Sequence, residues 1–203
     1  MRPYLIPAEP VSFTEEIKKS RFITYLAHTE GTEAAKKFIE SIKKQYPDAR
    51  HHCWAFVAGR PDDSQQLGFS DDGEPTGTAG KPMIAQLLGS QIGEITCVCV
   101  RYFGGIKLGT GGLVKAYGNG AQQALKLLQT KTKIPQKIFH LNCDYSQISL
   151  VEQFVSQSEG QIINSEYGES VALQISLPAT LEAVCGDKLR DMSRGTLKLT
   201  PES

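Results

Sequence analysis

The chain has 203 residues, of which 40% are hydrophobic and 22% charged, and its 22 basic and 22 acidic residues give no formal net charge. This composition is that of a globular protein, and the length is enough for one substantial core or two small ones. No stretch approaches the roughly 20 apolar residues of a membrane span, and the first residues lack the apolar run of a signal peptide. We therefore expect a soluble, cytoplasmic protein with no membrane partner.

The first part of the chain predicts a mixture of strands and helices. Strands are expected where β-branched and aromatic residues alternate, and helices where apolar residues recur every three or four positions. The predicted strands are 11–17, 21–27, 52–58 and 94–101, and the predicted helices run from a Thr32 cap to Pro47, over 83–88 and over about 112–129. Residues 60–80 form a polar run without periodicity, which is uncommon inside a compact domain and often functional.

The pattern changes near residue 135, where the charge also changes sign. Residues 1–135 hold 17 Lys and Arg against 13 Asp and Glu, whereas residues 136–203 hold 5 against 9. The predicted elements that follow are a strand over 139–145, a helix capped by Ser146, strands over 161–167 and 171–177, a helix over 181–192 and a strand over 195–200. This β-α-β-β-α-β order is that of a ferredoxin-like sandwich. We predict two domains, 1–134 and 135–203, and an α+β fold class.

The strongest candidate for chemistry is the segment 101–112, where a predicted strand leads through a Gly-rich turn into a helix. No acidic residue occurs between Glu94 and Asp144, and the N–H groups at a helix start bind phosphate or carboxylate, which glycines allow to come close. The spacing fits neither GxGxxG nor GxxxxGK[ST], so a nucleotide-binding loop is not supported. The alternative is a structural turn whose glycines satisfy positive φ angles and tight packing.

Arg101 stands beside two aromatic residues, the combination that contacts phosphates and stacks on unpaired bases. Since neighbours on a strand point to opposite faces, Tyr102 and Phe103 cannot share that surface unless the strand ends first, so we expect one of them in the core. The predicted nucleic-acid or anion-binding residues are Lys19, Arg21, Arg101, Tyr102, Phe103, Gly104, Gly105, Lys107, Gly109, Gly111, Gly112 and Lys115.

Acidic residues in the polar run offer a second candidate site. Asp71, Asp72 and Glu74 could hold a divalent cation or perform acid–base work, but they lack EF-hand spacing and loop carboxylates are usually solvated. His51 and His52 diverge on a strand, and no HxxxH or CxxC completes a metal site around them. We therefore predict no metal, no cofactor and no catalytic residue, and leave open whether the two histidines are structural.

Four segments together resemble the YigZ/IMPACT family, most closely its bacterial members. They are residues 16–22, 49–53, 71–80 and 100–109, the last containing Val100-Arg101-Tyr102-Phe103-Gly104-Gly105. The resemblance covers essentially the whole chain. It implies an N-terminal ribosomal-protein and elongation-factor-like α+β domain, followed by a ferredoxin-like domain similar to the last domain of elongation factor G. Eukaryotic members resemble regulators of translation initiation that act through a protein partner, and for bacterial members a nucleic-acid or ribosome-linked role is implied.

The hypothesis is therefore a non-enzymatic protein that binds structured RNA or a ribosomal surface through the basic face of its first domain, with a link to translation regulation. Two alternatives stay open. One is an enzyme that binds a small anion or a nucleotide phosphate with the Gly-rich turn and the acidic run 60–80. The other is a protein-binding regulator that acts through the acidic second domain. The sequence predicts no particular oligomeric state.

Overall fold

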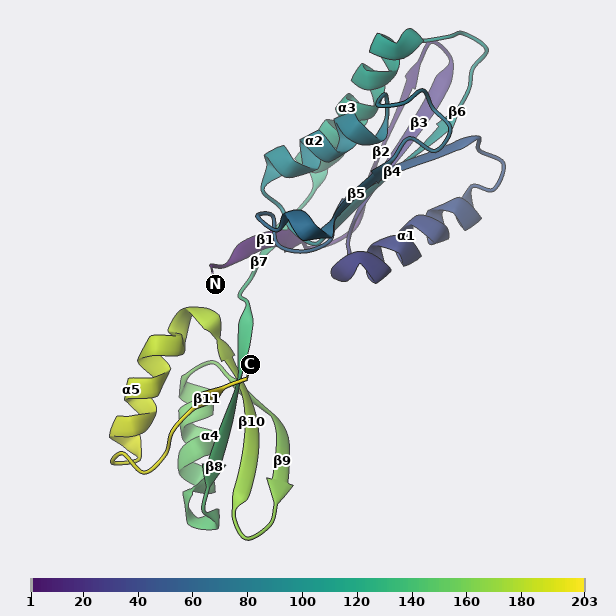
Figure 1. Ribbon diagram of the computed structural model, residues 1–203. Coiled ribbons are helices and arrows are strands. Elements are labelled where there is room, and N and C mark those ends of the chain that lie inside the picture. Colours follow the sequence, from purple (N-terminus) through teal and green to yellow (C-terminus); the bar gives the residue numbers. More distant parts are fainter. Residues whose placement is uncertain (1, 203) are drawn as a thin grey trace. The chain divides into compact units, whose positions relative to one another are not determined.

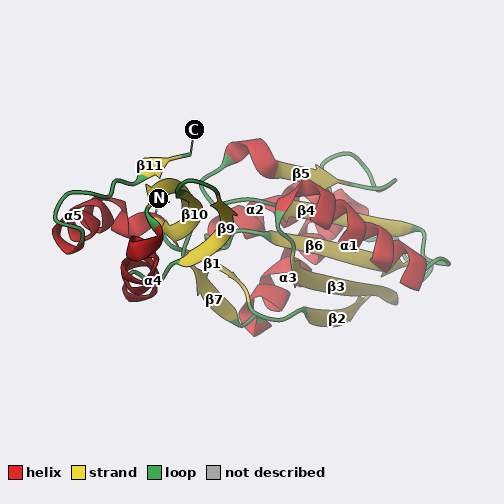
Figure 2. Cartoon of the chain, turned by 90° about the horizontal axis from the view of Figure 1, so that it is seen from below, coloured by secondary structure: helices red, strands yellow, loops and turns green. Residues whose placement is uncertain are grey.

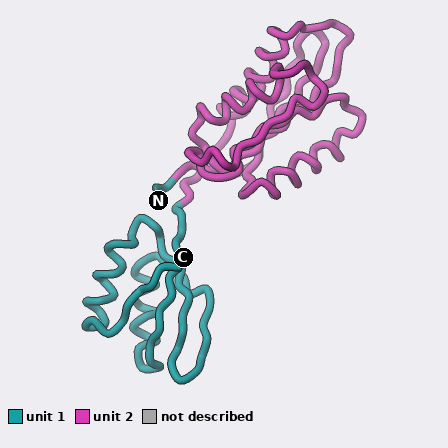
Figure 3. The backbone as a smooth tube through the Cα atoms, in the orientation of Figure 1, with its two compact units in different colours: residues 1–3, 134–203 teal, residues 4–133 magenta. Residues whose placement is uncertain are grey.

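The computed structural model describes residues 2–202 and divides into two compact units, which Figure 3 shows in different colours. Residues 4–133 form the larger unit, and residues 1–3 with 134–203 form the smaller unit. Both combine helices with antiparallel strands (Figure 2), so the predicted α+β fold is confirmed. Among the described residues, none of the helices has the length and apolar character needed to cross a membrane.

The larger unit is built around a five-stranded antiparallel sheet in the order β2-β3-β6-β4-β5. Its elements are β1 (Tyr4–Pro7), β2 (Val11–Ile17), β3 (Ser20–His28), α1 (Gly31–Gln45), β4 (His51–Val57), η1 (Ser64–Gln66), β5 (Leu67–Ser70), α2 (Gly80–Ser90), β6 (Ile95–Tyr102), α3 (Gly109–Leu127) and β7 (Thr130–Lys133). Helix α1 covers one face of the sheet, and helices α2 and α3 cover the other (Figure 1). Strands β1 and β7 pair with each other as a separate two-stranded sheet.

The central strand β6 explains how one sheet supports two cores. Side chains alternate between the faces of a strand, so Cys97 and Cys99 pack with α2 and α3 while Val98 and Val100 pack with α1. All of them are fully buried, and the cysteines are free thiols. A strand buried on both faces explains why β6 is apolar almost throughout. Whether a residue has an odd or an even position along β6 therefore decides which of the two cores its side chain joins.

The smaller unit is a four-stranded antiparallel sheet in the order β11-β8-β10-β9. Its elements are β8 (Gln136–Cys143), η2 (Tyr145–Gln147), α4 (Ile148–Gln157), β9 (Gln161–Tyr167), β10 (Val171–Pro178), η3 (Ala179–Leu181), α5 (Glu182–Met192) and β11 (Thr200–Pro201). Residues of α4, α5 and the sheet share one apolar core. The succession β-α-β-β-α-β is the predicted ferredoxin-like arrangement.

Some local predictions are wrong where short segments depend on tertiary contacts. The polar run 60–80 is not structureless, because β5 within it pairs with β4 at the edge of the sheet. The strand predicted over 195–200 is reduced to Thr200–Pro201. Residues 67–70 form a strand, and most of 195–200 does not, because strand formation depends on pairing with a neighbouring strand as well as on the local pattern. The β1–β7 pair also depends on such pairing, and the local pattern did not predict it.

Helix starts also differ from the predictions. Helix α1 begins at Gly31 with Glu30 in the cap position, so Thr32 is not its cap. Asp144, not Ser146, forms a capping box with Gln147 before α4. Helix α2 begins at Gly80, before Pro82, and α3 begins at Gly109, three residues earlier than predicted. The earlier start of α3 places Gly109, Gly111 and Gly112 inside the helix, whereas Gly104 and Gly105 stay in the loop before it.

Candidate nucleic-acid and anion-binding site

Strand register brings distant parts of the larger unit together where β6 ends. Arg101 lies opposite Phe22 of β3 and opposite His51 of β4, and Tyr102 lies opposite Arg21. The β2–β3 turn, the start of β4 and the loop after β6 are therefore neighbours at one end of the sheet. We call this region the β6 end.

The two aromatic residues of the β6 end differ because Tyr102 is the last residue of the strand and Phe103 comes after it. Tyr102 turns toward the α1 face, where its ring lies under the Arg21 guanidinium, 4.6 Å from ring centroid to Cζ, and its hydroxyl donates to Asp48 Oδ1 at 2.8 Å. Phe103 follows the last strand residue and is 48% exposed. The expectation that one of the two is core is met in part: Tyr102 is partly buried against the core on the α1 side, whereas Phe103 lies at the surface because β6 ends at Tyr102.

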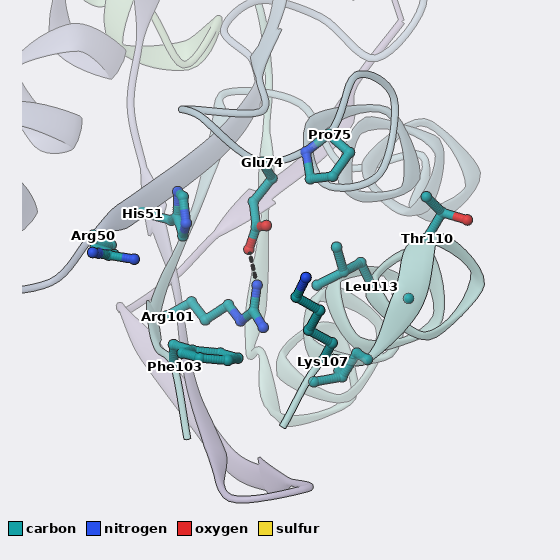
Figure 4. A pocket seen from close by; sticks show the side chains of 11 residues that line it. Arg50, His51, Glu74, Pro75, Arg101, Phe103, Lys107, Thr110 and Leu113 are labelled. Atoms are coloured by element: carbon teal, nitrogen blue, oxygen red, sulfur yellow. Dashed lines mark hydrogen bonds and ion pairs between the residues drawn. The ribbon is translucent and has the colours of Figure 1, made fainter. Parts of the chain in front are cut away.

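A pocket of ≈ 430 Å³ opens at the β6 end (Figure 4). It is lined by residues at the start of β4, in the loop before α2, at the end of β6, in the loop after β6 and at the start of α3: Arg50, His51, Glu74, Pro75, Arg101, Phe103, Lys107, Leu108, Gly109, Thr110 and Leu113. The guanidinium of Arg101 lies in the middle of these residues, with Phe103 and Lys107 beside it (Figure 4). The volume is within the range of small-molecule sites and near its lower limit.

Arg101 is a buried cation, only 5% exposed, and hydrogen bonds to other side chains of the larger unit hold it in place. Its Nη1 donates to Glu74 Oε1 at 2.6 Å, and the same oxygen accepts the Tyr117 hydroxyl at 2.7 Å. Burial raises the pKa of Tyr117, so this phenol stays a donor over the whole physiological range. Within the described residues, Arg101 Nε has no hydrogen-bond partner, although an unsatisfied buried donor of a charged group is costly.

The start of α3 adds backbone donors to the same pocket. The first four N–H groups of a helix have no partner within the helix, and here the cap residue is Leu108, which makes no side-chain capping bond. The first turn of α3 contains no acidic residue. The positive end of the helix dipole and its free amides therefore face the pocket at Gly109 and Thr110.

The glycines of the turn divide into structural positions and open ones. A Cβ on Gly104 would lie 2.0 Å from the backbone of Lys19, so only glycine lets the loop pack against the β2–β3 turn. Gly105 and Gly109 have positive φ angles of 86° and 76°. Gly111 has nothing within 4 Å of an added Cβ, and Gly112 lies next to Leu108. The structural interpretation thus explains Gly104, Gly105 and Gly109, while Gly111 is the position with open space around it.

The acidic residues of the run 60–80 are engaged in structural hydrogen bonds. The Asp71 carboxylate accepts the backbone N–H groups of Gly77, Ala79 and Gly80 at 2.7, 3.0 and 2.9 Å, which fixes the start of α2. Burial works to raise the pKa of Asp71, but the three backbone donors outweigh it and hold the pKa below its usual value. Among the described residues, no group of three or more His, Cys, Asp or Glu side chains is placed to hold a metal ion.

Asp72 anchors the two histidines from the same loop. Its Oδ2 accepts the backbone N–H of His52 at 2.7 Å, and its carbonyl oxygen lies 2.8 Å from His51 Nδ1. His52 Nε2 lies 2.8 Å from the carbonyl oxygen of Tyr46. These contacts tie the histidines to the scaffold, and only His51 also lines the pocket.

The structure places the predicted site residues in three groups. Arg101, Phe103, Lys107 and Gly109 line the pocket. Gly111 and Gly112 follow in the first turn of α3, and Lys19, Arg21, Tyr102, Gly104 and Gly105 lie at the β6 end beside it. Lys115 is separate, because it lies in a groove between α2 and α3 with Pro82 and Asn119. Sequence reasoning missed Arg50 and Thr110, whose membership depends on strand pairing and on the true start of α3.

Comparison with known proteins agrees with this architecture. Residues 18–125 match the Impact N-terminal domain, and residues 141–196 match a domain of unknown function (DUF1949). The chain is 62% identical over 199 residues to IMPACT family member YigZ of Escherichia coli, covering 98% of each chain. It is 38% identical over 158 residues to IMPACT family member YvyE of Bacillus subtilis, covering 78% of this chain and 72% of that one.

A solved structure is equally similar. The crystal structure of a hypothetical protein is 60% identical, with a TM-score of 0.83, and the match covers 100% of this chain and 98% of that one. Both matched domains, the near-complete coverage and the shared fold lead to one conclusion: the chain belongs to the IMPACT family.

Proposed function

We propose that this chain is a non-enzymatic RNA-binding protein whose interface is the β6 end of the larger unit. The observation that carries the proposal is an exposed aromatic ring, Phe103, on the same end of the sheet as five exposed cations: Lys18, Lys19, Arg21, Arg50 and Lys107. Within residues 2–202, none of these five cations forms an ion pair. Unpaired cations beside an exposed aromatic ring are what single-stranded nucleic acid requires.

The turn that carries two of these cations supports the proposal. Lys18 and Lys19 form the two-residue connection between β2 and β3, and both have positive φ angles, 47° and 65°. Such a turn favours Asn-Gly, and a left-handed conformation costs a non-glycine residue about 1 kcal/mol or more. Strained residues that persist are typical of functional sites, and here the strain presents two ammonium groups at the proposed interface.

Two of the nearby acidic side chains are engaged by groups of the protein itself. Asp48 accepts the hydroxyl of Tyr102, and Glu74 is buried against Arg101. The alternative in which Asp71 and Asp72 act as catalytic carboxylates is not favoured, because backbone N–H groups already occupy them. We therefore place phosphate contacts on the five exposed cations and base stacking on Phe103.

Fluorescence anisotropy with a short single-stranded RNA at increasing salt tests the proposal. The Arg50→Ala/Lys107→Ala variant should bind about tenfold or more weakly, and its plot of log affinity against log salt should be shallower by about 0.7 for each phosphate that the variant no longer neutralises. Lys115→Ala, on the α2–α3 groove, is the matched control and should bind as the wild type does. Absence of binding at low salt, or an equal loss of affinity in the control, contradicts the proposal.

Ribosomal RNA is the expected natural ligand, which would connect the protein to translation in the cytoplasm. Membership of the IMPACT family supports this part of the proposal. Co-sedimentation of the purified chain with ribosomes at low salt tests it. The same Arg50→Ala/Lys107→Ala variant should remain in the supernatant, and co-sedimentation that is insensitive to both the variant and the salt would point to another surface.

A further inference from the structure

The pocket at the β6 end contains a feature that a general RNA surface does not need. The side chain of Arg101 is buried, its Nη1 is bound to Glu74, and its Nε–H has no hydrogen-bond partner among the described residues. Buried donors of charged groups are almost always satisfied. The Nε atom itself has almost no exposed surface, so an acceptor that enters the pocket meets the guanidinium and reaches Nε only if the neighbouring side chains shift.

Other donors converge on the same place. The N-terminal amides of α3 lie at the pocket without a side-chain cap, and Thr110 and Lys107 are among the residues that line it. In Figure 4 the Lys107 side chain points toward Arg101. Free helix amides, a guanidinium and an ammonium together are the donor set that proteins use for phosphate.

The charge of the pocket fits a dianion. Three cations, Arg50, Arg101 and Lys107, are present with one carboxylate, Glu74. The surplus is therefore positive by two charges, and the dipole of α3 adds to it. A phosphate monoester carries about −1.5 to −2 near neutral pH, whereas a phosphodiester carries a single negative charge.

The position of the donors also favours a terminal phosphate monoester over a phosphodiester inside a strand. Arg101 is buried, so a phosphate must enter the pocket to contact its guanidinium. A phosphodiester inside a strand has a sugar on both sides and cannot enter end-on. A terminal phosphate monoester has one substituent and three free oxygens, and Phe103 lies beside the pocket, 48% exposed, where the base of that terminal nucleotide can stack.

We propose that this pocket binds the phosphate monoester at the end of an RNA strand. The proposal rests on the proposed RNA-binding function and adds its specificity: the exposed cations of the β6 end hold the strand, and the pocket recognises whether its end is phosphorylated. The volume of ≈ 430 Å³ suits one nucleotide-sized group rather than a duplex.

The test compares labelled RNAs of one sequence that end in a 5′-phosphate, a 3′-phosphate or hydroxyl groups only. A phosphorylated strand should bind at least about tenfold more tightly than the hydroxyl strand, because several charge-assisted hydrogen bonds depend on that group. Inorganic phosphate and a nucleoside monophosphate serve as competitors, and both should remove the difference at high concentration.

Variants locate the effect in the pocket. Thr110→Asp places a carboxylate among the helix amides, where it favours the helix but repels an anion, and it should abolish the preference for the phosphorylated strand. Thr110→Asn has a similar shape without the charge and should retain the preference. Arg101→Lys keeps a cation near Glu74 but removes the Nε–H, and it should reduce the preference several-fold while thermal unfolding shows a folded protein.

The outcomes separate this inference from the proposed function. Equal binding of all strands, weakened equally by salt, overturns the pocket assignment and leaves RNA binding intact. Binding of the nucleoside monophosphate without binding of any RNA overturns both and makes the pocket a nucleotide site. A preference that survives in Thr110→Asp to the same degree as in Thr110→Asn also overturns the assignment.

Discussion

Individual residues at the β6 end combine strain with exposure. Lys18 and Lys19 adopt left-handed backbone conformations in a turn that Asn and Gly would occupy without strain. Gly104 packs so closely on Lys19 that no side chain fits there. The backbone of this turn is thus determined by packing, whereas both lysine side chains are exposed.

Replacing the two lysines should separate stability from binding. We expect Lys18→Asn/Lys19→Gly to raise the free energy of unfolding by about 1–2 kcal/mol, because the new residues adopt positive φ angles at little cost. RNA affinity should fall at the same time, because two cations are removed. Urea unfolding and anisotropy on the same samples measure both, and a variant that is more stable with full affinity would remove this turn from the interface.

At the scale of elements, Glu94 joins the two sheets of the larger unit. It is 2% exposed, and its oxygens accept from Tyr4 of β1 and Lys133 of β7 at 2.6 Å each, with His28 Nε2 of β3 also at 2.6 Å. Burial works to raise the pKa of Glu94, but the hydrogen bonds from Lys133, Tyr4 and His28 outweigh it and lower the pKa. The carboxylate therefore stabilises the fold in its ionised form.

Removing this charge should loosen β1 and β7. We expect Glu94→Gln to lower the free energy of unfolding by about 2–3 kcal/mol at neutral pH, because it leaves a partly buried Lys133 facing an amide. Since the pKa of Glu94 is lowered on folding, its contribution is present above its unfolded pKa of about 4.3 and is lost as the pH falls through the folded value. The difference in free energy of unfolding between variant and wild type, measured with urea, should therefore become smaller below about pH 4.

The exposed partner of Lys133 provides the control. Glu30 also binds Lys133, at 2.7 Å, but it is 69% exposed. Glu30→Gln should change the free energy of unfolding by less than about 1 kcal/mol, because an exposed ion pair contributes little. Equal losses of stability in the Glu30 and Glu94 variants would mean that the buried position has no special role.

At the scale of the whole molecule, the two units have separate apolar cores, one set on the five-stranded sheet and one on the four-stranded sheet. We propose that residues 1–134 and 135–203 are independent domains, as the change of charge near residue 135 suggests. Each fragment expressed alone should then unfold cooperatively, and fragment 1–134 should keep the RNA affinity of the full chain. A fragment 135–203 that binds RNA with that affinity would move the interface to the other unit.

The alternation of apolar residues by itself determined the main elements of both units. Strands over 11–17 and 161–167 match the structure, and the helical spacing of the smaller unit was enough to predict its ferredoxin-like order. Periodicity carries this information because side chains alternate on strands and repeat every 3.6 residues on helices. The motif around Arg101 likewise indicated the family before any tertiary contact was known.

Tertiary structure alone decided which charges meet. Lys107 and Lys115 look equivalent in sequence, but the loop after β6 places Lys107 in the pocket with Arg101, whereas helix α3 places Lys115 in another groove. The pairing of Arg101 with Glu74, 27 positions away, depends on a loop that has no periodic pattern. Local sequence cannot express such contacts, because they arise from the register of strands that are distant in the chain.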